Sequence, residues 1–149
     1  MIRWILDNLG GSRAPEPEEL DIWKAQNIDT IINLLNGDYG KFITEEQKKK
    51  GFNVIRIPFS MADPIPAEDF LAVYSYIDEL LENGKKVVVH CKYGQARSGT
   101  FLAGYLIYKG LSYEDALNKV MSKGFSPHTD YQIKFLKELE SDVKRKNEK

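Results

Sequence analysis

The sequence predicts an α/β fold of three layers, in which a mostly parallel central sheet lies between two layers of helices. Short segments rich in β-branched residues alternate with amphipathic segments from one end of the chain to the other. The run at 85–90 is apolar with almost no alternation, which is typical of a central strand covered on both faces. The segment 101–108 is apolar on all sides, as expected for a helix buried inside a domain.

Composition and charge narrow the class of protein. The chain has 149 residues, of which 42% are hydrophobic and 29% charged, so we expect one globular domain over residues 1–149. A formal net charge of -1 gives no general attraction to nucleic acid or to an acidic membrane. No apolar run can span a bilayer, the N-terminus lacks the pattern of a signal peptide, and the single cysteine excludes an internal disulfide. We therefore expect a cytoplasmic monomer that binds neither nucleic acid nor membrane.

The first quarter of the chain predicts two strands and a helix. Residues 4–6 form a short strand, and the glycine-containing segment 8–12 is predicted to be a turn. Two prolines and two glutamates stand near the start of the helix predicted at 18–25. Residues 28–35 are rich in β-branched side chains and are followed by Asn-Gly, so they predict a buried strand.

The middle of the chain continues this alternation. Residues 44–47 fit a capping box that opens a short lysine-rich helix ending at Gly51. Residues 52–57 alternate as a strand does, and a loop with three prolines follows at 58–66. A helix is predicted at 67–83. Its apolar face consists of Phe70, Tyr74, Ile77 and Leu81.

Three helices are predicted after the strand at 85–90. The buried helix ends at Gly110, and Ser112 begins the next one. The last helix begins near Thr129, whose spacing from Gln132 fits a capping box, and it ends in a solvated basic tail. The inner faces of the last two helices are predicted to consist of Tyr113, Ala116, Leu117, Val120 and Met121, and of Tyr131, Phe135 and Leu139.

The only cysteine stands at the carboxyl end of the predicted central strand, where parallel sheets bind their ligands. Arg97 follows Cys91 by six residues, at the predicted start of the buried helix. A cysteine in such a place is more often structural, and the arginine can be an ordinary exposed cation. However, a helix N-terminus disfavours positive charge, and a bound anion would remove this conflict. Because the helix and Arg97 would also stabilise a thiolate, we interpret Cys91 as a nucleophile in a phosphate-binding loop.

The residues between the cysteine and the arginine are expected to bind phosphate through their backbone N–H groups. Gly94 stands in the middle of the loop, where a positive φ or a close backbone approach is needed. Ser98 can be the first polar cap of the helix, a hydroxyl that donates to the Cys91 sulfur, or both. The predicted phosphate-binding residues are Lys92, Tyr93, Gly94, Gln95, Ala96 and Arg97.

The pattern His90-Cys91-x5-Arg97-Ser98 resembles the signature loop of the cysteine-dependent protein tyrosine phosphatases. The chain length and the order of strands and helices resemble the compact dual-specificity members, particularly small archaeal ones. The similarity extends over nearly the whole chain. The resemblance implies a signature loop between the central strand and a buried helix, and a reaction that needs no cofactor. Supporting stretches lie at 9–12, 31–34 and 132–136.

The resemblance also implies roles for residues outside the loop. Asp63 matches the family's general acid; the alternative is a turn or helix-capping carboxylate, and Asp69 in the next helix is a rival. Gln132 matches the glutamine that positions the hydrolytic water, which is an alternative to its role in the capping box. His90 matches the histidine that supports the loop by hydrogen bonds, or it is an ordinary core histidine. We expect no metal site, because neither histidine has a cysteine at ligand spacing.

Two departures from the family pattern affect the substrate. Family members often have an arginine before the proline of a late loop, where this chain has Phe125-Ser126-Pro127. Lys92 matches the loop of lipid phosphatases, but those enzymes have a second lysine where this chain has Gln95. A highly charged inositide headgroup is therefore a weaker candidate substrate.

Together these residues predict a protein phosphatase that acts on phosphoproteins and hydrolyses phosphotyrosine through a cysteinyl-phosphate intermediate. Phosphoserine and phosphothreonine are expected to be poorer substrates, because an alkoxide leaves less easily than a phenolate. One alternative is an enzyme that removes phosphate from RNA 5′ ends or from inositol phosphates. Another is a phosphoprotein-binding module without turnover, and a more remote one is a sulfur-transferring rhodanese-like enzyme.

Overall fold

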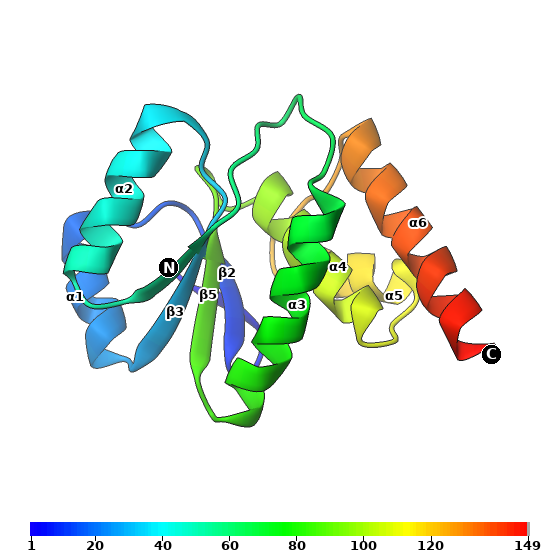
Figure 1. Ribbon diagram of the computed structural model, residues 1–149, viewed down its shortest axis with the longest axis horizontal. Coiled ribbons are helices and arrows are strands. Elements are labelled where there is room, and N and C mark those ends of the chain that lie inside the picture. Colours follow the sequence, from blue (N-terminus) through cyan, green and yellow to red (C-terminus); the bar gives the residue numbers. More distant parts are fainter. Residues whose placement is uncertain (149) are drawn as a thin grey trace.

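The computed structural model describes residues 1–148 and contains five strands and six helices in that range (Figure 1). Their order along the chain follows the predicted alternation except near the N-terminus and before the second helix. The elements are β1 Arg3–Leu6, β2 Leu9–Ser12, α1 Pro17–Ala25, β3 Ile28–Asn33, α2 Gly37–Lys49, β4 Asn53–Arg56, α3 Ala67–Glu82, β5 Lys86–His90, α4 Ala96–Tyr108, α5 Tyr113–Ser122 and α6 Asp130–Asn147.

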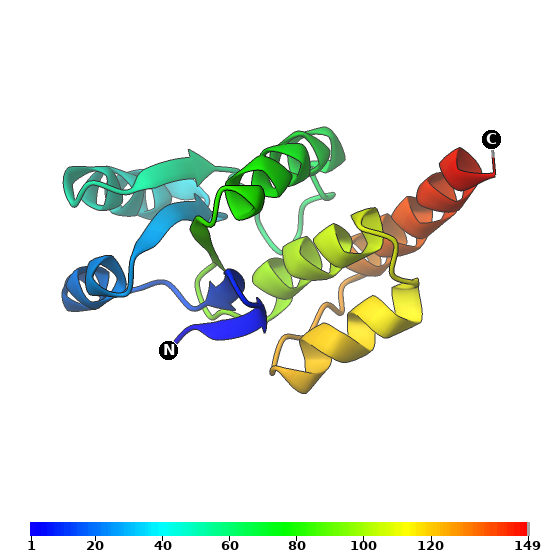
Figure 2. The ribbon, with the colours of Figure 1, turned by 90° about the horizontal axis from the view of Figure 1, so that it is seen from below.

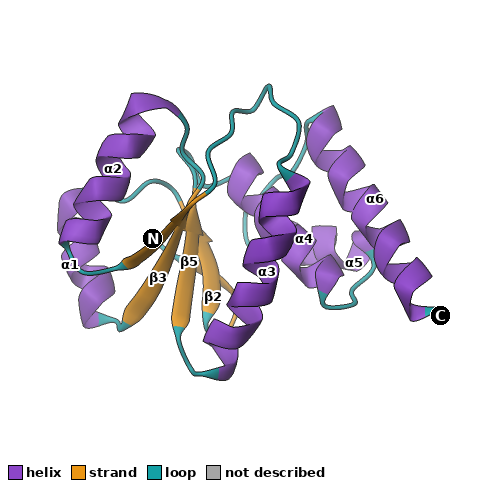
Figure 3. Cartoon of the chain, viewed as in Figure 1, coloured by secondary structure: helices purple, strands orange, loops and turns teal. Residues whose placement is uncertain are grey.

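The five strands form one sheet in the order β1-β2-β5-β3-β4. The pairs β2–β5, β5–β3 and β3–β4 are parallel, whereas the edge strand β1 is antiparallel to β2. Helices α1 and α2 cover one face of the sheet, and α3, α4, α5 and α6 lie on the other (Figures 1 and 3). Figure 2 shows the same layers from below, with the end of α6 furthest from the sheet. The predicted three-layer sandwich with a mostly parallel sheet is confirmed.

The central position of β5 explains its sequence. Val87, Val88 and Val89 have no exposed surface, because β2 and β3 flank the strand and helices cover both faces. The helix that follows is equally buried, and every residue of α4 from Ala96 to Ile107 lies in the interior. The loop between these two elements is therefore anchored at both ends in the interior of the protein.

The segment 8–12 was predicted to be a turn, and this prediction is wrong, because residues 9–12 form β2, next to the central strand. Its glycines serve close packing. A Cβ at Gly11 would lie 2.6 Å from the Phe125 ring and 2.8 Å from Leu102, so only glycine fits between sheet and helix there. The reversal of the chain is made by the two residues before Leu9.

The capping box predicted at 44–47 is also wrong. Helix α2 begins seven residues earlier, at Gly37, and Thr44 lies inside it with its hydroxyl donating to the Gly40 carbonyl at 2.8 Å. Glycine has low helix propensity, which concealed this start in the sequence. Tertiary packing outweighs that propensity, since Gly40 lies so close to the Leu35 carbonyl that a Cβ would collide with it.

The predicted helix faces are confirmed in their main residues and wrong at the edges. In α3, Phe70, Tyr74 and Ile77 are buried together with Leu80, while Leu81 is only partly buried. Met121 of α5 and Tyr131 of α6 are exposed, although both were assigned to inner faces. The two predicted capping boxes differ in outcome, since the one at Thr129 is present.

A buried network of polar side chains joins β3, α2 and β5 beneath the loop. Asn33 Nδ2 donates to Thr44 Oγ1 at 3.1 Å and to Gln47 Oε1 at 3.3 Å. The Gln47 amide nitrogen lies 2.8 Å from His90 Nε2, and His90 Nδ1 lies 3.3 Å from the Cys91 carbonyl oxygen. Because an amide nitrogen only donates, Nε2 accepts and Nδ1 carries the proton that the carbonyl accepts. The network thus fixes the tautomer of a neutral His90.

Burial lowers the pKa of His90 to about 4, and the positive charge of Arg97 acts in the same direction. We expect the free energy of unfolding to decrease as the pH falls from 6.5 to about 4, by up to about 3 kcal/mol from this group. The unfolded chain takes up the proton near pH 6.5, whereas folded His90 resists it, so protonation favours unfolding in this window. Urea unfolding at several pH values measures the decrease.

NMR titration of the two histidine rings gives the matching pKa in the folded protein. The variant His128→Asn removes the exposed histidine, so the one remaining ring signal belongs to His90. This variant should retain most of the pH dependence of unfolding. A folded-state titration of His90 near 6.5 would contradict the buried network.

Candidate active site

The candidate site lies where β5 ends at His90 and α4 begins at Ala96, at the carboxyl edge of the parallel strands (Figure 1). Cys91 is almost fully buried, with 3% of its surface exposed. The buried Ser98 hydroxyl donates to the Cys91 sulfur at 3.1 Å. The second interpretation of Ser98, a donor to sulfur, is therefore the one that its geometry supports. Sulfur, hydroxyl and helix N-terminus meet at the floor of the loop.

The loop is shaped by donors that hold its carbonyl groups on the outside. Gly94 has a φ of 70°, the left-handed conformation that glycine adopts without strain. Since a trans peptide points its N–H away from its carbonyl, an outward carbonyl leaves the next N–H facing the inside of the loop. The four tethered carbonyls belong to Cys91, Lys92, Gly94 and Gln95, and their respective donors are His90 Nδ1, the Ala14 N–H at 3.1 Å, the Arg3 guanidinium and the Ser126 N–H at 3.2 Å.

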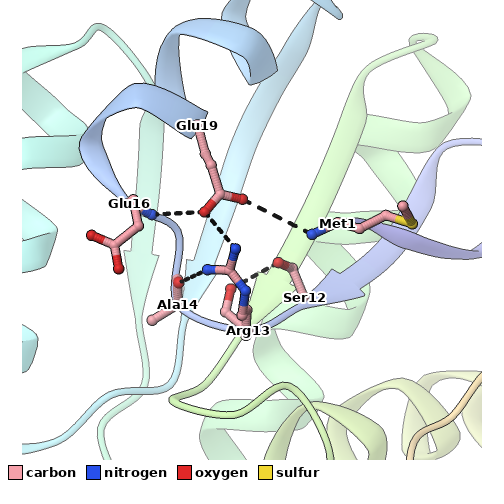
Figure 4. A network of polar contacts seen from close by, with 6 residues as sticks. All are labelled: Met1, Ser12, Arg13, Ala14, Glu16 and Glu19. Carbon is pink, nitrogen blue, oxygen red and sulfur yellow. Dashed lines mark hydrogen bonds and ion pairs between the residues drawn. The ribbon is translucent and has the colours of Figure 1, made fainter.

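The segment before α1 fixes one of these donors (Figure 4). Arg13 pairs with Glu19 at 2.8 Å and also donates to the Ala14 carbonyl at 3.0 Å. Glu19 Oε1 accepts the Glu16 N–H at 3.1 Å, as part of the capping box of α1. The N–H of Ala14 then holds the Lys92 carbonyl. Such an exposed ion pair adds little stability, so its main effect is to set the direction of this backbone.

Arg97 is buried at the first turn of α4, with 8% of its surface exposed, so it is not an exposed cation. One guanidinium nitrogen donates to the Phe59 carbonyl at 2.9 Å and to Asn36 Oδ1 at 3.2 Å. Among residues 1–148, no carboxylate lies within 4.0 Å of it. Its partners are neutral, so its charge remains available to an anion in the loop.

Asp63 lies exposed in the loop between β4 and α3, which arches over the carboxyl edge of the sheet (Figure 1). One carboxylate oxygen accepts the Ser60 N–H at 2.7 Å, and the Asp63 N–H donates to the Ser60 carbonyl at 3.2 Å. In the described chain no hydrogen bond or ion pair joins Asp63 to Cys91 or Arg97. The connection is indirect, since Phe59 of the same loop holds Arg97.

Gln132 is buried at the start of α6, with 1% of its surface exposed. Its side-chain oxygen accepts the N–H groups of His128 at 3.0 Å and Thr129 at 3.2 Å, so the predicted capping box is present. Its amide nitrogen points the other way and lies 3.5 Å from the sulfur of Met61, in the loop that carries Asp63. Gln132 therefore caps its helix and also contacts the loop of the candidate acid.

The remaining predicted loop residues differ in exposure. The side chains of Lys92, Tyr93 and Gln95 are exposed, and Tyr93 has 70% of its surface in solvent with the Lys92 ammonium over its ring at 5.3 Å. Ala96 is buried as the first residue of α4.

Sequence reasoning missed three residues whose side chains bond to the loop, to Arg97 or to His90, namely Arg3, Asn36 and Gln47. Asn36 follows β3 just after its carboxyl end, which lies beside the end of β5, so its position relative to the strands was a usable signal. Arg3 and Gln47 reach the site only through strand pairing and helix packing, which no local pattern shows.

Among the described residues, no group of three or more His, Cys, Asp or Glu side chains is arranged to hold a metal ion. No helix in the same range is long and apolar enough to cross a membrane.

Comparison with known proteins gives one family. The family described as dual specificity phosphatase, catalytic domain, matches residues 13–142. The crystal structure of Tk-PTP in the active form has 34% sequence identity and a TM-score of 0.84, and the match covers 94% of this chain and 96% of that chain. Putative tyrosine phosphatase 123R of Invertebrate iridescent virus 6 is 42% identical over 101 residues, 65% of this chain and 71% of the viral protein.

A third relative matches only part of the chain. Dual specificity protein phosphatase 1B of Arabidopsis thaliana is 39% identical over 51 residues, which are 34% of this chain and 30% of that protein. The chain thus spans less than a third of the length of this relative. The family match nevertheless covers most of the present chain, and Tk-PTP matches nearly all of it. The protein therefore belongs to the dual specificity phosphatase family.

Proposed function

We propose that this protein is a protein phosphatase that hydrolyses phosphotyrosine through a phosphate bound covalently to Cys91. The environment of Arg97 is the observation that carries the proposal. Its buried guanidinium has only neutral partners, and Ser98 beside it donates to the Cys91 sulfur. A buried cation without an anion is costly, and a phosphoryl group in the loop supplies the missing charge.

In the first step, the thiolate of Cys91 attacks phosphorus and the bond from phosphorus to the phenolic oxygen breaks. Arg97 and the inward N–H groups of the loop bind the phosphate oxygens, whose charge they stabilise during the transfer. Asp63 gives its proton to the leaving oxygen. Because one Asp63 oxygen is held by the Ser60 N–H, the other oxygen is the one that carries this proton.

In the second step, water attacks phosphorus, the bond from sulfur to phosphorus breaks, and inorganic phosphate forms. Asp63 takes a proton from the water, and the Ser98 hydroxyl stabilises the departing thiolate through its existing hydrogen bond. Gln132 positions the water with its amide nitrogen, which already faces the loop of Asp63. His90 acts through the Cys91 carbonyl and transfers no proton.

The exposed side chains around the loop favour phosphotyrosine in a protein over a highly charged substrate. Tyr93 belongs to the phosphate loop and Met61 to the loop of Asp63, and both present apolar surface to solvent. Gln95 is exposed and uncharged at the position where a second lysine would serve a polyphosphate headgroup. Relatives named as tyrosine phosphatases support the same substrate class.

A panel of substrates tests this function. We expect release of phosphate from phosphotyrosine peptides to exceed release from phosphoserine peptides, RNA 5′-triphosphate and inositol phosphates. The variant Cys91→Ser should lose about three orders of magnitude or more in turnover and still bind the phosphotyrosine peptide, because the loop and Arg97 remain. Faster release from RNA or an inositol phosphate would replace the proposed substrate, and turnover by Cys91→Ser within tenfold of wild type would refute the nucleophile.

The leaving group tests the role of Asp63. Asp63→Asn should slow hydrolysis of alkyl phosphates by about 10²- to 10⁴-fold, and esters with good leaving groups far less, because only a poor leaving group needs the proton. The matched control is Asp69→Asn, which changes the same group in the first turn of α3. Equal slowing of both substrate classes by Asp63→Asn, or a larger effect of Asp69→Asn, would assign the acid elsewhere.

A further inference from the structure

Arg3 reaches the phosphate loop from the edge strand β1, near the N-terminus and about ninety residues before the loop in the sequence. Its guanidinium donates to the Gly94 carbonyl through Nη2 and to the Lys123 carbonyl through Nη1 at 3.3 Å. The centre of the guanidinium lies 4.0 Å from the centroid of the Phe125 ring, a stacked cation–π arrangement. Three separate contacts thus fix one side chain against the outside of the loop.

The surface on which Arg3 stacks is itself part of the support of the loop. Phe125 is buried, and a Cβ at Gly99 in the first turn of α4 would lie 2.8 Å from the Phe125 Cβ. The next residue, Ser126, donates its N–H to the Gln95 carbonyl at 3.2 Å. The late loop lacks the arginine that its family often has there, and an arginine from β1 lies against it instead.

The contact with Gly94 controls the direction of one peptide group. Gly94 has no Cβ and a φ of 70°, so the peptide between Gly94 and Gln95 can rotate more easily than its neighbours. If that peptide turned over, its carbonyl would face the bound anion and its N–H would face outward. Of the donors that hold loop carbonyls, Arg3 and His90 are the side chains, and Arg3 holds the peptide that follows the glycine.

We propose that Arg3 is a positioning residue of the phosphate loop, which holds the Gly94 carbonyl outward and so keeps the Gln95 N–H directed at the phosphate. This inference rests on the proposed function, since it assumes an anion in the loop. Partial burial lowers the pKa of Arg3, and the negative charge of a Cys91 thiolate acts in the opposite direction.

Binding of inorganic phosphate tests the proposal without turnover. We expect the dissociation constant of phosphate to increase about tenfold in Arg3→Met, because one inward N–H is no longer held in place. Arg3→Lys retains a cationic donor and should stay within about threefold of wild type. The matched control is Lys24→Met in α1, which removes a cation that likewise donates to a backbone carbonyl, that of Gly51 at 2.9 Å, and lies over a phenyl ring, that of Phe52, but contacts no residue of the phosphate loop; it should leave phosphate binding unchanged.

A second readout separates positioning from general stability. In NMR spectra, addition of phosphate should shift the Gln95 amide resonance in wild type and in Lys24→Met but not in Arg3→Met, at a temperature where all variants are folded. Unchanged phosphate affinity in Arg3→Met, or equal losses in Arg3→Lys and Arg3→Met, would overturn the role of Arg3. If wild type binds phosphate but hydrolyses no phosphotyrosine, the proposed function fails while the role of Arg3 is still decided by binding. If wild type binds no phosphate, both proposals are refuted.

Discussion

The guanidinium of Arg97 is buried at the N-terminus of α4, where the helix dipole already supplies positive charge and both of its hydrogen-bond partners are neutral. Cation and helix end concentrate positive charge in one place, and the described chain provides no carboxylate to balance it. The site is thus prepared for a doubly negative phosphoryl group, and the fold has to keep this charge in place without an anion. Burial of α4 from Ala96 to Ile107 provides that rigidity.

The loop itself is held from four directions, each by a different part of the chain. Edge strand β1 supplies Arg3, the segment before α1 supplies the Ala14 N–H, the late loop supplies the Ser126 N–H, and β5 supplies His90. These donors all bond to loop carbonyl groups and hold them outward, and the N–H groups of the same peptides therefore face the inside of the loop. The loop that carries Asp63 makes two contacts with the same site. Its Phe59 carbonyl accepts a hydrogen bond from Arg97, and its Met61 sulfur contacts the Gln132 amide nitrogen. These two contacts connect Arg97 and Gln132 to the loop that carries Asp63.

The local parts of this arrangement were predictable from the sequence, and the distant parts were not. Cys91, Arg97 and Ser98 lie within eight positions, in the loop after β5 and in the first turn of α4, so spacing alone places them together. Residues 9–12 were misassigned because their glycines indicate a turn, whereas they permit close packing against Phe125. The start of α2 at Gly37 was missed for the same reason. Arg3, Asn36 and Gln47 contact the site only after the sheet has formed, and Asp63 was placed in its loop but its distance from Cys91 could not be predicted.

Passage of the phosphoryl group through Cys91 is the central claim, and trapping of the intermediate tests it most directly. Rapid acid quench of Ser98→Ala mixed with a radiolabelled phosphotyrosine peptide, followed by peptide mapping, measures covalent phosphate on the protein. Loss of the hydroxyl that donates to the Cys91 sulfur should slow the second step, so one phosphate should accumulate on the peptide that contains Cys91. Product formation without covalent phosphate at any time, or phosphate on a peptide without Cys91, would contradict the mechanism.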